Sequence, residues 1–487
     1  MRWFQTMNKL LNKYRSLSVE VKAALWFVVC NFVNKAISMI VVPIYTRLLS
    51  TSEYGTYTVF QSWLNIFIIV MTLEISRGHF ALGITKYEDD SDRYTSAMLG
   101  LSNATTILFL IVYLFAIPFF NGVLEMNTPL VMGMFAYLLF YPAWEFWCIK
   151  QRFAYKYKRM VFGTLIVAFL SPIIGVVGIV WLGFKSEAAI LSKLVVQGVA
   201  ALGVYTLFIK KSPTPYVKSY WKEVLPYSLT LLPYLLSTMI LNQADRLMIN
   251  RMVGGSEAAI YSVAYSVAML TQLLNTAMNN AFVPWMYRRL KGKQYEKIEP
   301  VAAGLQMLVG IINLILIVFA PEVIAIFAPP QYMEAISIIP PVTASVYFMF
   351  IFQRYINVEM YYEKTASISI MSILIALLNI ILNYFCILKW GYLAAGYTTL
   401  ISYILFCIGH YFIVSRIEKT KCEGNIIFHA KGTIITGIGF LIISFGIMWL
   451  YDYAVIRYLV AAGLAVVAYK KKDVFMWMLK NKKQDAV

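Results

Sequence analysis

Long apolar stretches, separated by short connections, are the feature that most constrains this chain of 487 residues. A helix that crosses a bilayer needs about 20 mostly apolar residues. Stretches of this kind recur from residue 23 to residue 470, and no soluble domain fits between them. The sequence therefore predicts an all-α polytopic membrane protein with about 14 transmembrane helices. The predicted spans are 23–47, 55–78, 95–119, 129–149, 160–183, 187–209, 224–250, 257–282, 300–320, 336–357, 366–388, 392–414, 432–450 and 454–470.

Composition agrees with a membrane protein. Hydrophobic residues make up 60% of the chain and charged residues only 14%, whereas about 25% of the residues of a soluble domain are charged. The apolar excess has to be covered by lipid. The segment 1–22 mixes aromatic and basic residues, which suits an amphipathic helix on the cytoplasmic membrane surface; a frayed cytoplasmic tail is an equally good interpretation.

The distribution of basic residues orients the predicted spans. With the N-terminus inside, 34 of the 42 Lys and Arg residues fall on the inner side and five on the outer side. Cytoplasmic loops carry such an excess of positive charge. Both termini are therefore predicted to be cytoplasmic. The net charge of +18 lies in short loops beside the membrane, so topology explains it and no nucleic-acid partner is expected.

The sequence contains an internal repeat. Residues Arg47–Thr58 resemble Arg251–Ser262 at an offset of 204, and Tyr155 and Lys158 match Tyr361 and Lys364 at an offset of 206. Spans 1–6 thus resemble spans 7–12. The shift is an even number of spans, which predicts two six-helix lobes related by a pseudo-two-fold axis along the membrane normal, plus two extra C-terminal helices.

The repeat predicts a division of the chain into seven parts. These are a cytoplasmic amphipathic segment (1–22), an N-lobe (23–209), a cytoplasmic linker (210–223), a C-lobe (224–414), a cytoplasmic loop (415–431), spans 13 and 14 (432–470) and a basic cytoplasmic tail (471–487).

Polar residues inside the spans indicate a cavity, because charged groups in a bilayer usually face water or a packed interface. Spans 1, 2, 7 and 8 are the most polar, and under the repeat they are equivalent pairs. We expect them to line a central water-filled cleft. The candidate substrate-binding residues are Lys35, Asn31, Asn34, Arg77, Asn242, Asp245, Arg246, Gln272 and Asn275, and the coupling-ion candidates are Asp245 and Glu74.

Simpler structural interpretations remain for several charged residues. Asp245 and Arg246 are adjacent, so they point about 100° apart and cannot both face one cavity squarely; a purely structural Asp245 is as good an interpretation as a functional one. Lys193 is interpreted as a side chain that snorkels to the interface. Arg77 and Arg354 also suit ordinary anchors at inner helix ends.

Nothing in the sequence predicts an enzyme. No nucleophile motif, metal-ligand spacing or phosphate-binding glycine loop is present, and the five cysteines and three histidines are scattered. We expect no catalytic residues, no metal and no cofactor, apart from coupling to a proton or sodium gradient.

The chain resembles Wzx-type flippases for O-antigen and capsule repeat units, in the polysaccharide-export branch of the multidrug/oligosaccharidyl-lipid/polysaccharide transporter superfamily. The likeness extends over most of the chain. It is carried by Asn34–Lys35, Pro43–Ser50, Glu53–Tyr57, Ala244–Arg246, Gly255, Tyr261–Tyr265, Pro321–Glu322, Tyr332 and Ile339–Pro340.

The resemblance implies a flippase that moves undecaprenyl-diphosphate-linked oligosaccharide from the inner to the outer leaflet of the bacterial cytoplasmic (inner) membrane by alternating access. It serves O-antigen, lipopolysaccharide, capsule or related polysaccharide synthesis, with a polymerase and a chain-length regulator as candidate partners beside membrane lipid. Lys35, Arg77 and Arg246 are the implied partners of the diphosphate. A diphosphate in a low-dielectric cleft does need cations.

Two alternatives stay open. A multidrug cation antiporter of the same superfamily is the nearer one, although such antiporters usually have twelve spans and acidic cavity groups. An O-antigen polymerase or membrane glycosyltransferase is the more distant one, because its large outer loop is missing here.

Overall fold

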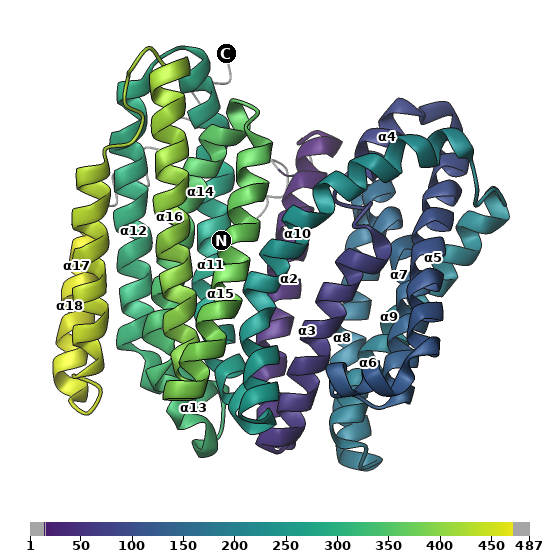
Figure 1. Cartoon of the computed structure of the whole chain (residues 1–487), viewed down its shortest axis with the longest axis horizontal. Coiled ribbons are helices and arrows are strands. Elements are labelled where there is room, and N and C mark those ends of the chain that lie inside the picture. Colours follow the sequence, from purple (N-terminus) through teal and green to yellow (C-terminus); the bar gives the residue numbers. More distant parts are fainter. Residues whose placement is uncertain (1–13, 15, 471–487) are drawn as a thin grey trace, which may run out of the picture. The chain divides into compact units, whose positions relative to one another are not determined.

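The computed structural model describes residue 14 and residues 16–470, and helices dominate this part of the chain, which contains no β-strand (Figure 1). The predicted basic tail, 471–487, and most of the predicted amphipathic segment, 1–22, lie outside the described residues. The chain divides into two compact units: an N-terminal unit, Met1–Leu49 with Phe60–Leu236, and a C-terminal unit, Ser50–Val59 with Ser237–Val487.

The N-terminal unit is built around α9, which packs against α7 and α8, while α2 packs against α8 and α5 against α7. Asn127 caps α7 by accepting a hydrogen bond from the Leu130 N–H at 3.2 Å, as a helix N-cap does. The helices of this unit are α2 (Val19–Leu48), α3 (Thr51–Thr72, except its first turns), α4 (Phe80–Lys86), η1 (Glu88–Asp90), α5 (Ser91–Phe115), α6 (Ile117–Leu124), α7 (Thr128–Phe153), α8 (Tyr157–Trp181), α9 (Lys185–Lys211) and the first half of α10 (Lys218–Met252).

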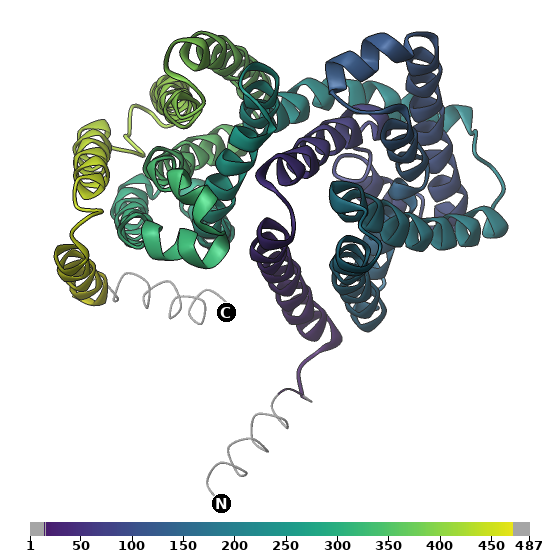
Figure 2. The ribbon, with the colours of Figure 1, turned by 90° about the horizontal axis from the view of Figure 1, so that it is seen from below.

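The C-terminal unit is built around α14 and α16, which pack against each other. Helices α17 and α18 both pack against α12 and lie at one edge of this unit (Figures 1 and 2). Besides the second half of α10, the unit contains α11 (Gly255–Lys291), η2 (Tyr295–Lys297), α12 (Ile298–Val318), α13 (Ala320–Phe327), η3 (Pro330–Ser337), α14 (Ile339–Tyr361), α15 (Thr365–Trp390), α16 (Ala394–Lys421), α17 (Ala430–Met448) and α18 (Ala454–Lys470).

The two units repeat the same order of elements. The pairs α5–α7, α7–α9 and α8–α9 in the N-terminal unit correspond to α12–α14, α14–α16 and α15–α16 in the C-terminal unit. Even the short helices α6 and α13 correspond: each has eight residues and a proline, Pro118 or Pro321, in its first turn. Proline suits this position because its missing N–H would be unpaired anyway. The predicted fold class, with two six-helix repeats and two further helices, is confirmed. The linker 210–223 stays a prediction, and α10 begins within it, at Lys218.

Each of the predicted spans overlaps a helix, although span 55–78 extends six residues past the end of α3 at Thr72. Within the described residues, nine helices are by themselves long and apolar enough to cross a membrane, or eleven if α7 and α14 are each joined to the bent element before them. The predicted spans that do not pass this test fall on α3, α11 and α18. Helix α18 is short, whereas α3 and α11 are the repeat-related helices of spans 2 and 8, which are rich in polar residues.

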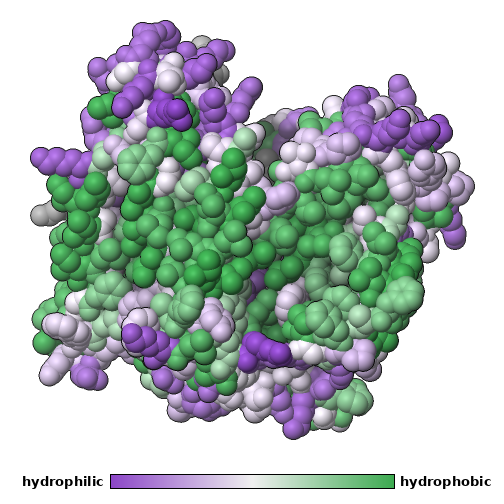
Figure 3. All heavy atoms as spheres, viewed as in Figure 1, coloured by the Kyte–Doolittle hydropathy of each residue, from purple (hydrophilic) through white to green (hydrophobic). Residues whose placement is uncertain are grey.

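The outer surface of each unit is apolar along the middle of its helices. Figure 3 shows hydrophobic side chains over this middle zone and hydrophilic ones toward the helix ends. Large apolar side chains in the middle of helices, such as Phe32 on α2, Val199 on α9 and Ile442 on α17, are more than 60% exposed. Surfaces of this kind are stable only in lipid.

A close backbone approach fixes the start of α3 in the C-terminal unit. A Cβ atom on Gly55 would overlap the Gly255 carbonyl group, so this contact requires glycine at position 55. Beside it, the Thr51 hydroxyl donates to the Ser256 hydroxyl at 3.0 Å. These residues lie in or beside the repeated loop motifs, which shows that the motifs contain packing residues.

Candidate substrate and ion sites

A buried carboxylate forms the centre of the C-terminal unit. Asp245 on α10 is 1% exposed. Its Oδ2 atom accepts hydrogen bonds from the Tyr261 hydroxyl on α11 and the Thr399 hydroxyl on α16, and its Oδ1 atom accepts one from the Asn383 amide on α15. The Thr399 and Asn383 bonds are 2.7 and 2.6 Å long. Asp245 thus joins four helices.

The hydrogen-bond network extends beyond Asp245. Asn383 also donates to Asn379 at 3.1 Å and accepts from Thr398, and Asn379 donates to Ser402 at 3.3 Å. We call Asp245, Tyr261, Asn379, Asn383, Thr398, Thr399 and Ser402 the Asp245 cluster. In the part of the chain that the structure describes, no cation forms an ion pair with Asp245, and its hydrogen-bond donors are all neutral groups.

The neighbouring residue Arg246 has a separate environment. Its guanidinium group stacks over the Tyr265 ring at 4.4 Å and donates to Gln243 at 2.8 Å. Its Nε atom is buried and has no hydrogen-bond partner. Asp245 and Arg246 therefore point to different surroundings, as their adjacency in a helix predicts, and Arg246 keeps an unused donor.

Three further candidates pack inside the C-terminal unit. Asn242 accepts hydrogen bonds from the Tyr265 and Tyr403 hydroxyls at 3.0 and 3.4 Å. Asn275 is 1% exposed and donates to the Val346 carbonyl at 2.9 Å, and it also lies 3.4 Å from the oxygen of the partly buried Gln272. These contacts give Asn242 and Asn275 a role in helix packing.

The α2 stripe of the N-terminal unit behaves differently. Asn31 and Lys35 are exposed and Asn34 is partly buried. Asn34 makes only a weak contact with the Cys30 sulfur at 3.6 Å, and its Oδ1 atom has no hydrogen-bond partner. The ammonium group of Lys35 is thus exposed near the middle of an apolar helix. Such a charge has to meet water, a polar ligand or the lipid headgroups.

The end of the second predicted span carries an ion pair. Glu74 is 4% exposed and lies 2.7 Å from Arg77, whose side chain is 65% exposed. The second carboxylate oxygen of Glu74 is buried without a hydrogen-bond partner. Among the described residues, Glu74 therefore forms an ion pair with a cation, whereas Asp245 does not.

Two charged residues differ from their sequence interpretation. Lys193 does not snorkel: it is partly buried, and its ammonium group donates to Gln61 on α3. Arg354 is not an exposed anchor: it is fully buried, and it donates to Thr433 at 3.3 Å. In both cases a polar partner on a distant helix holds the charge inside the bundle, which a single sequence does not reveal.

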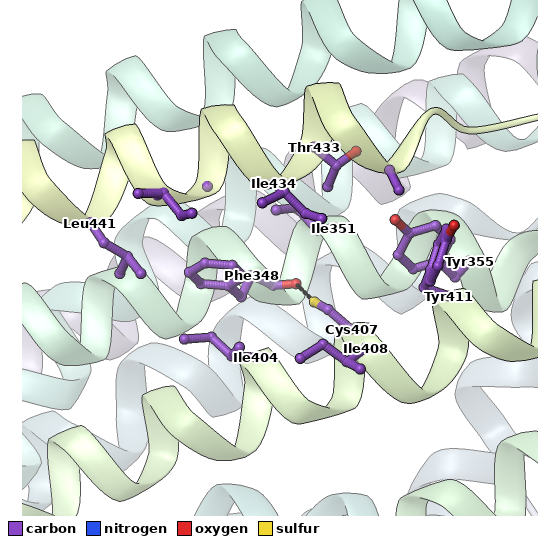
Figure 4. A pocket seen from close by; sticks show the side chains of 13 residues that line it. Phe348, Ile351, Tyr355, Ile404, Cys407, Ile408, Tyr411, Thr433, Ile434 and Leu441 are labelled. Atoms are coloured by element: carbon purple, nitrogen blue, oxygen red, sulfur yellow. Dashed lines mark hydrogen bonds between the residues drawn. The ribbon is translucent and has the colours of Figure 1, made fainter.

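An apolar crevice opens between α14, α16 and α17. Its volume is about 350 Å³. Figure 4 shows the side chains of Phe348, Ile404, Ile434 and Leu441 around it, with the Tyr355 and Tyr411 hydroxyls at one end. Cys407 in its wall donates to the Phe348 carbonyl at 3.1 Å. This lining suits a hydrocarbon chain.

The next question is whether the described residues include a metal site. Within the described residues, no group of three or more His, Cys, Asp or Glu side chains is arranged to hold a metal ion. The Asp245 cluster instead offers carboxylate, amide and hydroxyl oxygens, which suit a proton or a hard monovalent cation.

These features define a helical multi-pass membrane protein. The chain belongs to the polysaccharide biosynthesis protein family, whose model matches residues 21–289. No curated protein matches the sequence.

Solved structures share the fold. The lipid II flippase MurJ, in an inward closed conformation, has a TM-score of 0.69 and 14% identity, over 91% of this chain and 98% of its own. An inward-facing multidrug resistance MATE transporter has a TM-score of 0.58 and 13% identity, over 80% and 96%. A MOP superfamily transporter from Pyrococcus furiosus has a TM-score of 0.54 and 16% identity, over 82% and 95%. At these identities the likeness concerns the fold alone.

Proposed function

We propose that the protein is a flippase for undecaprenyl-diphosphate-linked oligosaccharide repeat units. It moves them from the inner to the outer leaflet of the bacterial cytoplasmic membrane by alternating access, for O-antigen, capsule or related polysaccharide synthesis. Both termini are cytoplasmic in this proposal, following the excess of basic residues on one side. A polysaccharide polymerase and a chain-length regulator are the proposed partners.

The exposed ammonium group of Lys35 is the observation that carries the proposal. It lies near the middle of α2 beside the exposed Asn31, whereas the rest of the helix is mostly apolar. A transporter that admits a charged, hydrated ligand needs such a face. In a family of polysaccharide biosynthesis proteins, a diphosphate bearing a sugar chain is the ligand that fits: Lys35 meets phosphate, and amides meet sugar hydroxyls.

Arg246 is the second proposed phosphate partner. Its Nε–H has no hydrogen-bond partner, and stacking on the Tyr265 ring holds the guanidinium plane in place. Guanidinium groups suit phosphate because their donors form a rigid fork. Arg77 is the weaker candidate, because it already pairs with Glu74.

The Asp245 cluster is the proposed site of ion coupling. A proton or a sodium ion bound there would neutralise a carboxylate that joins α10, α11, α15 and α16. Neutralisation changes the strength of these hydrogen bonds and hence the packing of the four helices. Glu74 remains the second coupling candidate.

The crevice between α14, α16 and α17 is proposed to hold part of a lipid chain. Its walls are almost entirely apolar, so it suits an isoprenoid segment of the carrier better than a sugar.

The test is the sidedness of the lipid-linked oligosaccharide in cells deleted for the gene. We expect the undecaprenyl-linked unit to accumulate on the cytoplasmic face and wild type to clear it. Lys35→Ala should fail to clear it, whereas Lys35→Arg should retain activity. Lys389→Ala, which removes an exposed lysine at the end of α15, is the matched control and should behave as wild type.

Two outcomes would contradict the proposal. If the unit reaches the outer leaflet without the protein but stays unpolymerised, the protein acts as a polymerase. If glycan export does not depend on the protein and its loss raises sensitivity to cationic drugs, a multidrug antiporter is the better description.

A further inference from the structure

A second buried pair of ionisable groups lies in the C-terminal unit, outside the Asp245 cluster. The side chains of Glu359 on α14 and His410 on α16 are both 0% exposed, and 2.5 Å separates the His410 Nδ1 atom from the Glu359 Oε1 atom. The other carboxylate oxygen of Glu359 accepts a hydrogen bond from the Ser367 hydroxyl on α15 at 2.8 Å. The pair therefore joins three helices.

The surroundings of the pair are apolar. The Phe406 and Phe352 rings lie 4.7 and 6.2 Å from the imidazole ring, measured between centroids. The His410 Nε2 atom is buried and has no hydrogen-bond partner. An unpaired buried polar atom costs about 1–3 kcal/mol, and apolar residues often replace a buried ion pair without loss of stability. Packing alone is thus a poor reason for this arrangement.

The unpaired nitrogen gives the site one exchangeable proton. With neutral His410 donating from Nδ1 to the Glu359 carboxylate, the pair carries one negative charge and Nε2 presents a free lone pair. One added proton makes the pair neutral overall and turns Nε2 into an N–H donor. An apolar interior disfavours a net charge, and the Glu359 carboxylate supplies the negative charge that compensates a proton on His410.

Other charged groups lie on the same and adjoining elements, but within the described residues none of them forms an ion pair with Glu359 or His410. These groups are Arg288 and Arg289 on α11, Glu299 on α12, Arg354 on α14, Glu363 and Lys364 in the turn after α14, Arg416 and Glu418 on α16 and Lys431 on α17. Cys407, three residues before His410 on α16, is a titratable neighbour, and its thiol already donates to a backbone carbonyl.

The position of the pair suggests which side of the membrane it serves. Glu359 lies two residues before the end of α14, and Ser367 lies in the first turn of α15. The turn between them is closed by a hydrogen bond from the Lys364 N–H to the Glu359 carbonyl at 2.8 Å, with Glu363 in the left-handed region at φ +57°. In the proposed topology this turn is cytoplasmic. Thr399 of the Asp245 cluster lies 11 residues before His410 on α16, or about 16 Å along the axis.

We propose that the Glu359–His410 pair is a proton-binding site that exchanges one proton with the cytoplasm and is distinct from the Asp245 cluster. Binding of the proton follows from the geometry of the pair itself. The cytoplasmic side and the link to the transport cycle rest on the proposed function.

Proton binding can be tested on the purified full-length protein without substrate. Infrared difference spectra between acid and alkaline pH should contain bands of the buried carboxyl and imidazole groups, and Glu359→Gln and His410→Gln should each lose both. Glu423→Gln is the matched control, because the Glu423 side chain is 73% exposed and its loss should leave these bands unchanged. Spectra of the two variants that superimpose on wild type would overturn the proposal.

A milder variant covers the case in which these substitutions prevent folding. Ser367→Ala removes one hydrogen bond to the carboxylate and leaves the pair intact, so the pH at which the buried bands change should differ from that of wild type. An unshifted titration in folded Ser367→Ala protein would contradict the assignment.

A transport assay tests the functional part separately. In proteoliposomes, Glu359→Gln should flatten the dependence of the flipping rate on internal pH, whereas a structural defect would lower the rate equally at every pH. An unchanged pH profile would overturn the link to transport. If wild type does not flip the lipid at all, the proposed function fails, and the infrared result still decides whether the pair binds a proton.

Discussion

The two units use equivalent helices to hold charges of opposite sign. In the N-terminal unit, Lys193 on α9 donates to Gln61 on α3. In the C-terminal unit, Asp245 accepts from Thr399 on α16 and Tyr261 on α11, and α16 and α11 are the repeat counterparts of α9 and α3. At the repeat offset of 204, Gln61 corresponds to Tyr265, which stacks on Arg246. The repeat therefore preserves architecture while the chemistry differs.

Asp245 and Lys193 differ in the number of hydrogen bonds that stabilise their charges. Asp245 accepts three hydrogen bonds and joins four helices, so a change in its charge acts on all of them. Lys193 donates to one amide, and its long apolar stem packs without help from the charge. We therefore expect coupling in the C-terminal unit and a mainly structural role for Lys193.

The largest predicted effect is the loss of Asp245. Asp245→Ala leaves the Tyr261, Thr399 and Asn383 donors unpaired, and each such group costs about 1–3 kcal/mol. We expect at least about a tenfold loss of flipping and a clear fall in melting temperature, whereas Lys193→Met should stay within about threefold of wild type. Flipping rates and thermal unfolding in detergent provide the measurements. Equal losses in the two variants would remove the distinction between the units.

Replacing the glycines at two close backbone approaches should give the next largest effect. A Cβ atom on Gly55 would overlap the Gly255 carbonyl in the C-terminal unit, and one on Gly100 would overlap the Pro215 carbonyl in the N-terminal unit. Gly55→Ala and Gly100→Ala should each destabilise by about 1–3 kcal/mol. Gly203→Ala on α9 is the control, because nothing lies within 4 Å of its added Cβ atom, and it should stabilise by about 0.5–1 kcal/mol. Thermal unfolding measures the stability of all three variants. Similar stabilities of Gly203→Ala and the other two variants would contradict the close packing at Gly55 and Gly100.

Loss of the ion pair between Arg457, at the start of α18, and Glu322 should have a smaller effect. This effect should be confined to the C-terminal unit. Arg457 donates to both oxygens of Glu322 at 2.8 and 2.9 Å and to the Val318 carbonyl at 2.8 Å. Arg457→Ala should lower the free energy of unfolding by about 2 kcal/mol, and proteolysis should cleave first between α17 and α18. Unchanged stability would show that α18 is held by apolar contacts only.

The pH dependence of the same pair gives the smallest predicted effect. The hydrogen bonds from Arg457 lower the pKa of Glu322, so the pair stabilises the protein at pH values above the unfolded pKa of about 4.3. This contribution is lost as the pH falls through the lower pKa of the folded state. Melting temperatures of wild type and Glu322→Gln should therefore differ at neutral pH and converge in acid. A difference that persists in acid would contradict the pKa assignment.

Sequence reasoning reached the architecture because apolar length, basic loops and repeat offsets are local signals. It also predicted different surroundings for Asp245 and Arg246, because the side chains of adjacent residues in a helix point about 100° apart. It missed the partners of Asp245: Asn383 and Thr399 lie 138 and 154 residues away, and no local pattern links them.

The Glu359–His410 pair was missed for a related reason. His410 lies inside the predicted span 392–414, and an ionisable residue within a span is itself a signal of function. Glu359 lies just beyond the predicted end of span 336–357 and looks like an ordinary residue at a helix end. Only the packing of α14 against α16 brings the two together.

The most direct test of the account is inner-to-outer transfer of a labelled undecaprenyl-diphosphate oligosaccharide in proteoliposomes that contain only this protein. The account predicts transfer by wild type, a strong loss in Lys35→Ala and Asp245→Ala, and near wild-type transfer in Lys193→Met. Transfer that is no faster than in protein-free liposomes, from a protein that is folded and inserted, would contradict the account.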